Sequence, residues 1–163
     1  MPSGSINMLI HRRPGDPRSG VYGTPKWFFE RINEEFCLEV DVCADEQNTC
    51  LPRFWSKKDN ALVQRWAPLR CWMNPPYGMK TERFCRKAVR EAAAGALVVA
   101  LLPARTDTHW WHTTVVHAAE IRFYEGRMKF EGMKTTGSFA QVLVIWRPER
   151  PFYGPVIRWE SIK

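Results

Sequence analysis

The sequence predicts one α/β domain with a mostly parallel sheet and an antiparallel hairpin at one edge. Strand-like and helix-like segments alternate along residues 21–148, as they do in parallel sheets whose strands are connected by helices. Residues 96–102 form an unbroken apolar run between Gly95 and Pro103, which is typical of a strand buried on both faces. Residues 121–124 and 139–146 are rich in strand-forming side chains, and we expect them to pair as the hairpin.

The overall composition favours a globular protein. The chain has 163 residues, of which 45% are hydrophobic and 25% charged, enough for one sizeable core. No apolar run approaches the roughly 18 residues that span a bilayer, and no apolar signal segment follows the first arginines. We therefore expect a cytoplasmic protein without a membrane partner. Five cysteines lack Cys-x-x-Cys spacing, which indicates reduced thiols rather than a metal site, with Cys71 and Cys85 in the core.

The charge distribution points to a polyanionic partner. The formal net charge is +7, which favours nucleic acid, although many soluble proteins without such a partner are also basic. Residues 1–20 are rich in Pro, Gly and Arg without a periodic pattern, and we expect a flexible basic arm. Residues 21–148 are the expected domain. Residues 149–163, which contain Pro151 and Pro155, are expected to be an extended tail.

The first folded segments place polar groups where a ligand could bind. Thr24 is a candidate cap for a helix that starts at Pro25, and such a start can also bind a ligand carboxylate. Residues 38–45 alternate as a strand does and include Asp41 and Asp45. Carboxylates at the end of such a strand can accept ribose hydroxyls or an amino group, although they can equally be turn caps. Asp59, after a short strand at 52–55, is a candidate acceptor for an adenine amino group, or a helix cap.

The most informative segment follows the predicted strand at 69–73. Asn74, Pro75, Pro76 and Tyr77 form a stiff turn, because each proline fixes its own φ and keeps the preceding residue extended. The Asn74 amide oxygen and the Pro75 carbonyl can accept both hydrogens of a conjugated amino group. That arrangement favours a pyramidal nitrogen whose lone pair attacks a methyl group, with Tyr77 stacking on a planar substrate. An ordinary Pro-Pro turn is the competing interpretation.

The second half of the domain adds two helices and a basic loop. Apolar residues recur at helical spacing over 81–94, and Gly95 suits the helix end. Thr106 or Asp107 is a candidate cap for a helix that carries Trp110 and Trp111. Residues 126–137 are basic and interrupted by glycines. We find no internal repeat.

The Asn-Pro-Pro-Tyr motif resembles that of S-adenosylmethionine-dependent amino-methyltransferases. The chain as a whole is similar to the phage-encoded DNA N6-adenine methyltransferases, a Dam-like family. The resemblance covers roughly residues 22–146 and is carried by an ordered set of segments: Thr24-Pro25, residues 38–45, Asn48, residues 60–62 with Trp66, residues 72–78, residues 102–107 with Trp110-Trp111, and residues 126–130. Each segment is weak alone, whereas their order is specific.

The resemblance implies a minimal Rossmann-like methyltransferase fold, S-adenosylmethionine as donor, and adenine in double-stranded DNA as acceptor, flipped out of the duplex. It implies the host cell cytoplasm and no obligate protein partner. The catalytic residues implied are Asn74, Pro75, Pro76 and Tyr77. Those implied to bind the cofactor are Thr24, Pro25, Asp41, Cys43, Ala44, Asp45, Asp59 and Asn60. Those expected to contact DNA are Arg105, Arg127, Lys129 and Lys134.

The chain departs from common methyltransferase patterns in two ways. Many of these enzymes carry glycine after the first strand, where this chain has Cys43-Ala44-Asp45. No separate target-recognition domain is apparent, so specificity would come from the loops at 126–137 and 57–60. Two alternatives stay open: an amino-methyltransferase acting on RNA or on a protein glutamine, and a catalytically silent DNA-binding protein on the same fold.

Overall fold

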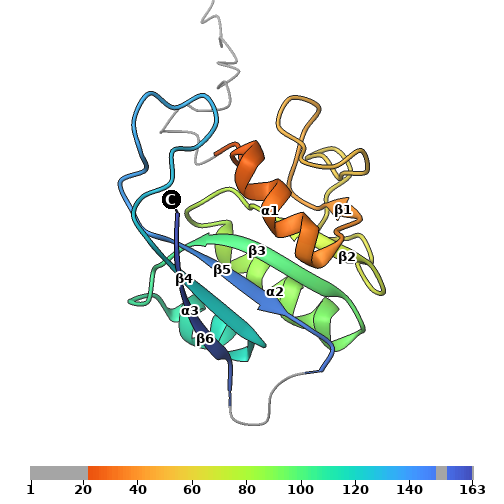
Figure 1. Cartoon of the computed structure of the whole chain (residues 1–163). Helices are drawn as coiled ribbons and strands as arrows, with labels where there is room; N and C mark the ends of the chain where they lie inside the picture. Colours follow the sequence, from red (N-terminus) through yellow and green to blue (C-terminus); the bar gives the residue numbers. More distant parts are fainter. Residues whose placement is uncertain (1–21, 150–153, 163) are drawn as a thin grey trace, which may run out of the picture.

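The structure, a computed structural model, describes residues 22–149 and 154–162, so the predicted basic arm lies outside the described residues. The described chain contains a six-stranded sheet in the order β1-β2-β3-β5-β4-β6 (Figure 1). The strands are β1 Val40–Asp41, β2 Arg70–Met73, β3 Leu97–Pro103, β4 Glu120–Glu125, β5 Gln141–Trp146 and β6 Val156–Ser161. The helices are α1 Lys26–Phe36, α2 Thr81–Ala93, α3 His109–Thr114 and the short 3-10 helix η1 Val115–His117.

The sheet is mixed. β1, β2 and β3 run parallel, β5 runs antiparallel to both β3 and β4, and β6 runs parallel to β4. The predicted pairing of β4 with β5 is confirmed, but the prediction that this pair forms the sheet edge is wrong. The segment expected to be an extended tail contributes β6, which pairs with the outer side of β4 and becomes the edge strand.

Both faces of the sheet are buried at its central strands β3 and β5. α1 covers one face, and α2 and α3 cover the other (Figure 1). The predicted doubly buried strand is β3, where Val98, Ala100 and Leu102 pack towards α2 while Val99 and Leu101 pack towards α1. This division follows the two-residue period of a strand. Cys71 and Cys85 are fully buried, as expected, and all five cysteines are free thiols.

Three local predictions differ from the structure. The strand expected over 38–45 is only two residues long as β1, because the Asp41 side chain accepts the N–H of Cys43 and turns the chain. The short strand expected at 52–55 is reduced to a single bridge between Phe54 and Asp41. Neither predicted helix cap is used. The residue before α1 is Pro25 rather than Thr24, and the residue before α3 is Thr108 rather than Thr106 or Asp107. Neither helix start has a side-chain capping bond.

The strand directions place most of the candidate residues along the line where the parallel strands β1, β2 and β3 end, which we call the carboxyl edge of the sheet. The carboxyl ends of β1, β2 and β3 lie there, at Asp41, Met73 and Pro103. β5 begins at the same edge, since Gln141 is opposite Pro103, and β4 ends there, since Phe123 is opposite Val142. The segments that follow β1 and β4 therefore project from one end of the molecule (Figure 1). Among the described residues, no helix is long and apolar enough to cross a membrane.

A buried ionic network joins the far half of the sheet to α1. The Arg122 side chain is 6% exposed and donates to Glu35 through two 2.6 Å hydrogen bonds and to Glu120 at 2.6 Å. Glu120 also accepts from Arg158 of β6 at 2.6 Å. The hydrogen bond from Arg122 lowers the pKa of Glu35. One guanidinium thus links α1, β4 and, through Glu120, β6.

We expect Arg122→Met to lower the free energy of unfolding by about 3 kcal/mol, because removing one member of a buried ion pair leaves its partner poorly compensated. Urea denaturation at pH 7 measures the change. The matched control is Arg31→Met, whose guanidinium is half exposed and lies 3.5 Å from Glu160; it should cost less than about 1 kcal/mol. Equal losses from the two variants would contradict this account.

Candidate active site

The predicted catalytic turn leaves β2 at the carboxyl edge and is tied to the start of α2. The Thr81 hydroxyl donates to the Pro76 carbonyl at 3.1 Å and accepts from the Gly78 N–H at 3.0 Å. Gly78 has φ +116°, a conformation that side chains beyond glycine rarely adopt. The turn is therefore held from both ends, by β2 before Asn74 and by α2 after Gly78.

The orientation of the Asn74 amide is fixed by two acceptors. Its Nδ2 donates to the Tyr22 carbonyl at 2.6 Å and to the Thr24 hydroxyl at 3.0 Å. A carbonyl oxygen only accepts hydrogen bonds, so the amide nitrogen, not the oxygen, has to face Tyr22. The Oδ1 atom is buried and has no hydrogen-bond partner among the described residues. The Pro75 carbonyl likewise accepts no bond from the described part of the chain.

Tyr77 lies in a group of four rings that we call the aromatic cluster: Tyr22, Tyr77, Phe130 and Phe139. The Tyr77 hydroxyl donates to the Leu101 carbonyl at 3.3 Å. Burial raises the pKa of Tyr77, so the hydroxyl stays protonated. Phe130 and Phe139 contact Tyr77 edge-on, at interplanar angles of 76° and 70°, whereas Tyr22 lies at 33° with centroids 5.1 Å apart. Sequence reasoning missed Tyr22, Phe130 and Phe139, although Tyr22 lies only two residues before the Thr24-Pro25 segment.

The 126–137 loop is joined to the N-terminal segment beside Asn74. Glu131 N donates to the Gly23 carbonyl at 2.9 Å in an antiparallel bridge. A Cβ at Gly23 would lie 2.9 Å from the Glu131 Cβ, closer than such atoms approach in proteins, so this contact requires glycine. The bridge holds Phe130 and Tyr22 in contact, with centroids 5.0 Å apart.

The Asp41 carboxylate organises the turn after β1. Its two oxygens accept from the backbone N–H groups of Cys43 at 3.2 Å and Cys50 at 3.1 Å. Burial raises the pKa of Asp41 to about 6. Burial also raises the pKa of the Cys50 thiol to about 12, although a hydrogen bond with the Thr24 side chain acts in the opposite direction and lowers it. A chain of contacts therefore connects Asp41 through Cys50 and Thr24 to Asn74.

The remaining predicted cofactor residues are placed differently. Cys43 and Ala44 lie in the turn two and three residues after Asp41. The Pro25 carbonyl accepts the first hydrogen bonds of α1. Asp45 accepts from Gln47 and Asn48 and closes its own turn. Asp59 is exposed and accepts from the Ser56 N–H and hydroxyl at 2.7 and 2.6 Å. The structure thus brings Thr24 and Asp41 together with Asn74, while the carboxylates of Asp45 and Asp59 are used locally.

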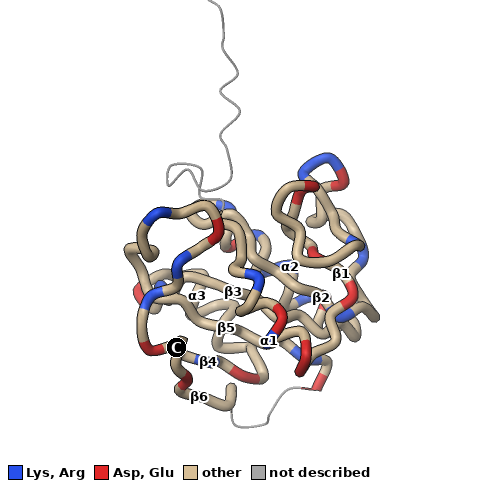
Figure 2. Tube along the Cα trace, turned by 45° about the horizontal axis from the view of Figure 1, so that its top comes forward, with Lys and Arg blue, Asp and Glu red and all other residues tan. Residues whose placement is uncertain are grey.

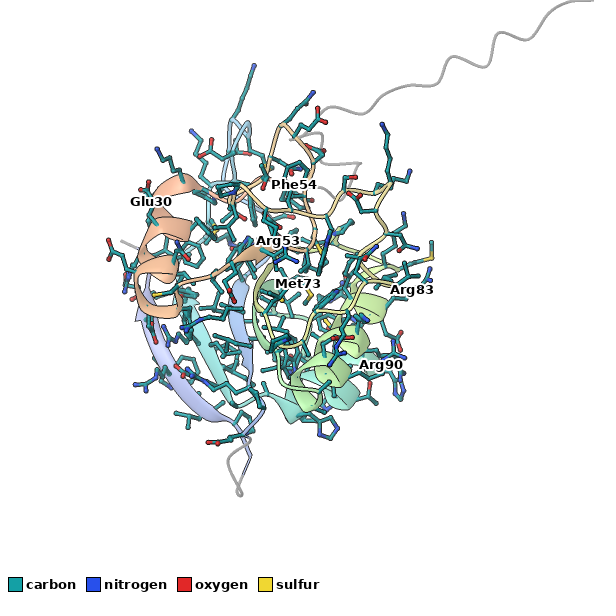
Figure 3. All side chains as sticks on the ribbon, turned by 90° about the vertical axis from the view of Figure 1, so that its right-hand side faces the viewer. Glu30, Arg53, Phe54, Met73, Arg83 and Arg90 are labelled. Atoms are coloured by element: carbon teal, nitrogen blue, oxygen red, sulfur yellow. The ribbon has the colours of Figure 1, made fainter. Side chains whose placement is uncertain are left out.

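A separate groove of about 510 Å³ lies beside α2. Arg83 and Arg90 project along this side (Figure 3). Its lining contains no carboxylate and none of the catalytic-turn residues; it consists of Asn60, Leu62, Val63, Arg83, Arg86, Val89, Arg90, Thr113 and Thr114. Asn60 therefore faces a basic groove. In the described segments, no group of three or more His, Cys, Asp or Glu side chains could hold a metal ion.

The predicted DNA-contacting cations are exposed. Arg127, Lys129 and Lys134 lie on the 126–137 loop, while Met128 and Phe130 between them are buried. In Figure 2 the loops that project at this end of the molecule carry Lys and Arg (blue) together with Asp and Glu (red). Arg105, after β3, pairs with Asp107 at 3.0 Å, which raises the pKa of Arg105 and lowers that of Asp107. Its charge is thus partly neutralised.

Comparison with known proteins gives one family. The sequence matches, over residues 15–158, the family model described as DNA N-6-adenine-methyltransferase (Dam). It is 29% identical over 140 residues to the DNA N-6-adenine-methyltransferase of Haemophilus phage HP1 (strain HP1c1), with 81% of each chain covered. It is 32% identical over 88 residues to the DNA N-6-adenine-methyltransferase of Escherichia phage T1, covering 53% of this chain and 37% of the phage T1 protein.

The raised pKa of Asp41 predicts a pH-dependent contribution to stability. Because the folded protein holds this proton up to about pH 6 and the unfolded chain releases it near pH 4, the contribution of Asp41 falls as pH rises from 4 to 6, by on the order of 3 kcal/mol. Urea denaturation of the wild type and Asp41→Asn at pH 4, 5, 6 and 7 measures it. Relative to the variant, the wild type should lose stability over this interval; a constant difference between the two would refute the assignment.

Proposed function

Because the family match spans most of its length, the chain belongs to the DNA N-6-adenine-methyltransferase (Dam) family, and we propose that the turn from Asn74 to Tyr77 is its catalytic site. Members of this family methylate the N6 amino group of adenine in DNA, and this chain is such an enzyme. Both relatives are named for this acceptor, which favours it over RNA or a protein glutamine.

One observation carries the assignment of the site. The Asn74 amide presents an oxygen that no described residue satisfies, although the same amide makes two bonds through its nitrogen. A buried acceptor without a partner costs about 1–3 kcal/mol, so such an atom points to a bound group that satisfies it. An adenine amino group has two hydrogens, which match Asn74 Oδ1 and the unused Pro75 carbonyl.

The mechanism follows from these acceptors. The adenine leaves the duplex, because its N6 is unreachable inside the stack, and stacks on Tyr77. Asn74 Oδ1 and the Pro75 carbonyl accept the two amino hydrogens and favour a pyramidal nitrogen whose lone pair is available. When bound, S-adenosylmethionine supplies an electrophilic methyl group. The rigid turn between β2 and α2 contributes mainly by positioning, and no strong general base is required.

The carboxyl edge beside Asn74 fits the proposed donor. Thr24, Asp41, Cys43 and Ala44 offer a hydroxyl, a carboxylate and backbone groups next to the catalytic turn, in the position where open α/β sheets bind ligands. Pro25 borders this segment. We place the more distant Asp45, Asp59 and Asn60 at the margin of the site, where the two carboxylates would exchange their local bonds for ligand contacts.

The same reasoning extends to the fold and to DNA. We propose that the sheet is a minimal Rossmann-like methyltransferase sheet, since its parallel half carries the catalytic turn at its carboxyl edge. Double-stranded DNA would lie across that edge, with Arg127, Lys129 and Lys134 on its phosphates and Arg105 released from Asp107. Residues 126–137 and 57–60 would supply sequence preference.

Direct product analysis tests the catalytic assignment. Purified wild type, incubated with unmethylated DNA and S-adenosylmethionine, should yield N6-methyl-2′-deoxyadenosine detectable by mass spectrometry after digestion to nucleosides. Asn74→Ala should lower kcat by about 100-fold to 1,000-fold, the usual loss for one positioned hydrogen-bonding group. Asn33→Ala removes a similar amide far from the turn and should keep wild-type turnover. Near-normal turnover by Asn74→Ala would exclude this mechanism.

The salt dependence of DNA binding tests the basic loop. A plot of log affinity against log salt concentration should lose about 0.9 of its slope for each phosphate contact removed, so Arg127→Gln and Lys129→Gln should each reduce it by about that amount. Arg147→Gln is the control, since Arg147 is exposed and follows β5 at the opposite edge of the sheet. Equal slopes for all three variants would place the DNA elsewhere.

A further inference from the structure

We propose that the Tyr22 ring occupies the place of the target adenine on Tyr77 until DNA binds, and leaves it when the base enters. This inference rests on the proposed role of Asn74 and Tyr77, and it adds a residue that positions the base by competing with it. Three features of the site lead to it: the fixed Tyr77 ring, the closed amide oxygen, and the separate roles of the Tyr22 backbone and side chain.

The Tyr77 ring is anchored, and the Tyr22 ring packs against it. Its hydroxyl is bonded to the Leu101 carbonyl of β3, and Phe130 and Phe139 meet it edge-on. Of these three rings, Tyr22 is the closest to parallel with Tyr77, tilted by 33° with the ring centroids 5.1 Å apart. A flat base stacks at a shorter separation than this, in the same space. Adenine and the Tyr22 ring therefore exclude each other on this face.

The Asn74 amide is closed to a base in this conformation. Its Oδ1 is buried, yet it is the atom that has to accept an N6 hydrogen. The Tyr22 carbonyl lies 2.6 Å from the nitrogen of the same amide. One residue thus contacts both parts of the proposed base pocket, the amide through its backbone and the stacking ring through its side chain.

Tyr22 is built so that its ring can leave while its carbonyl stays. The carbonyl is fixed by Asn74, and the next residue, Gly23, is held by its bridge to Glu131. The ring is only half-buried, and rotation about its Cα–Cβ bond moves it without breaking either backbone contact. Asn74 would keep its orientation throughout. The Tyr22 ring therefore covers the Tyr77 ring when no DNA is bound, and the adenine covers it when DNA is bound.

Competition of this kind has a measurable consequence. The apparent dissociation constant equals the intrinsic one divided by the fraction of molecules whose pocket is open. Removing the ring opens the pocket, so Tyr22→Ala should lower the KM for DNA by about threefold or more, without a matching fall in kcat. Tyr22→Phe keeps the ring and should restore the wild-type KM. Trp159→Ala removes an exposed ring on β6 and controls for loss of an aromatic side chain.

A binding measurement without methyl transfer separates this proposal from the proposed function. Duplex DNA with 2-aminopurine opposite an abasic site presents a base that is already unpaired, and stacking on Tyr77 quenches its fluorescence. Tyr22→Ala should reach half-maximal quenching at a lower protein concentration than the wild type, whereas Tyr22→Phe should not. If the wild type methylated no DNA, the proposed function would fail and this measurement would still decide the role of Tyr22.

Two results would overturn the proposal. A higher KM and weaker quenching in Tyr22→Ala would mean that the ring supports the bound base rather than competing with it. An unchanged KM with a lower kcat would mean that Tyr22 serves only to anchor the N-terminal segment. Circular dichroism and the thermal midpoint of each variant establish that the fold is retained.

Discussion

The hydrogen bond from Asn74 Nδ2 to the Tyr22 carbonyl is the contact on which the site depends. It decides which atom of the amide is left for a substrate, because a carbonyl can only accept. It also joins the end of β2 to a segment that precedes α1. Through the Gly23–Glu131 bridge the same segment holds the 126–137 loop. Three stretches that are remote in sequence thus meet at one side chain.

Such a site carries unfavourable free-energy terms that the rest of the fold has to offset. An unpaired buried Oδ1 and a buried Asp41 carboxylate each cost free energy in the folded protein. The compensation lies in the sheet beneath them. β2 and β3 are buried between helices on both faces, and the Arg122 network secures the distant half. A rigid base of this kind allows the polar edge to remain incompletely satisfied until a ligand arrives.

The sequence alone predicted the elements with strong periodic patterns and the rigid turn from Asn74 to Tyr77, whose prolines fix its dihedrals. α2 and β3 lie within one residue of their predicted ranges, because amphipathic and fully apolar patterns are hard to misread. β6 was missed because its residues are mostly exposed and follow several prolines. The side-chain caps predicted for α1 and α3 failed because Thr24 bonds to Asn74 and Asp107 to Arg105. The contact of Thr24 crosses the fold, whereas that of Asp107 is a local ion pair with a residue two positions earlier.

The aromatic cluster was beyond sequence reasoning for a topological reason. Phe130 and Phe139 reach Tyr77 because β4 ends and β5 begins at the carboxyl edge, which places the connection between them there. Tyr22 reaches the same place through its bond to Asn74 and the Gly23–Glu131 bridge. Within that loop the side chains alternate, with Met128 and Phe130 inward and Arg127 and Lys129 outward. One short segment therefore presents rings to the proposed base pocket and cations to the solvent. Through the Glu131–Gly23 bridge this segment is also hydrogen-bonded to the backbone next to Tyr22, so the outward cations and all the rings around Tyr77 are carried by one connected piece of backbone.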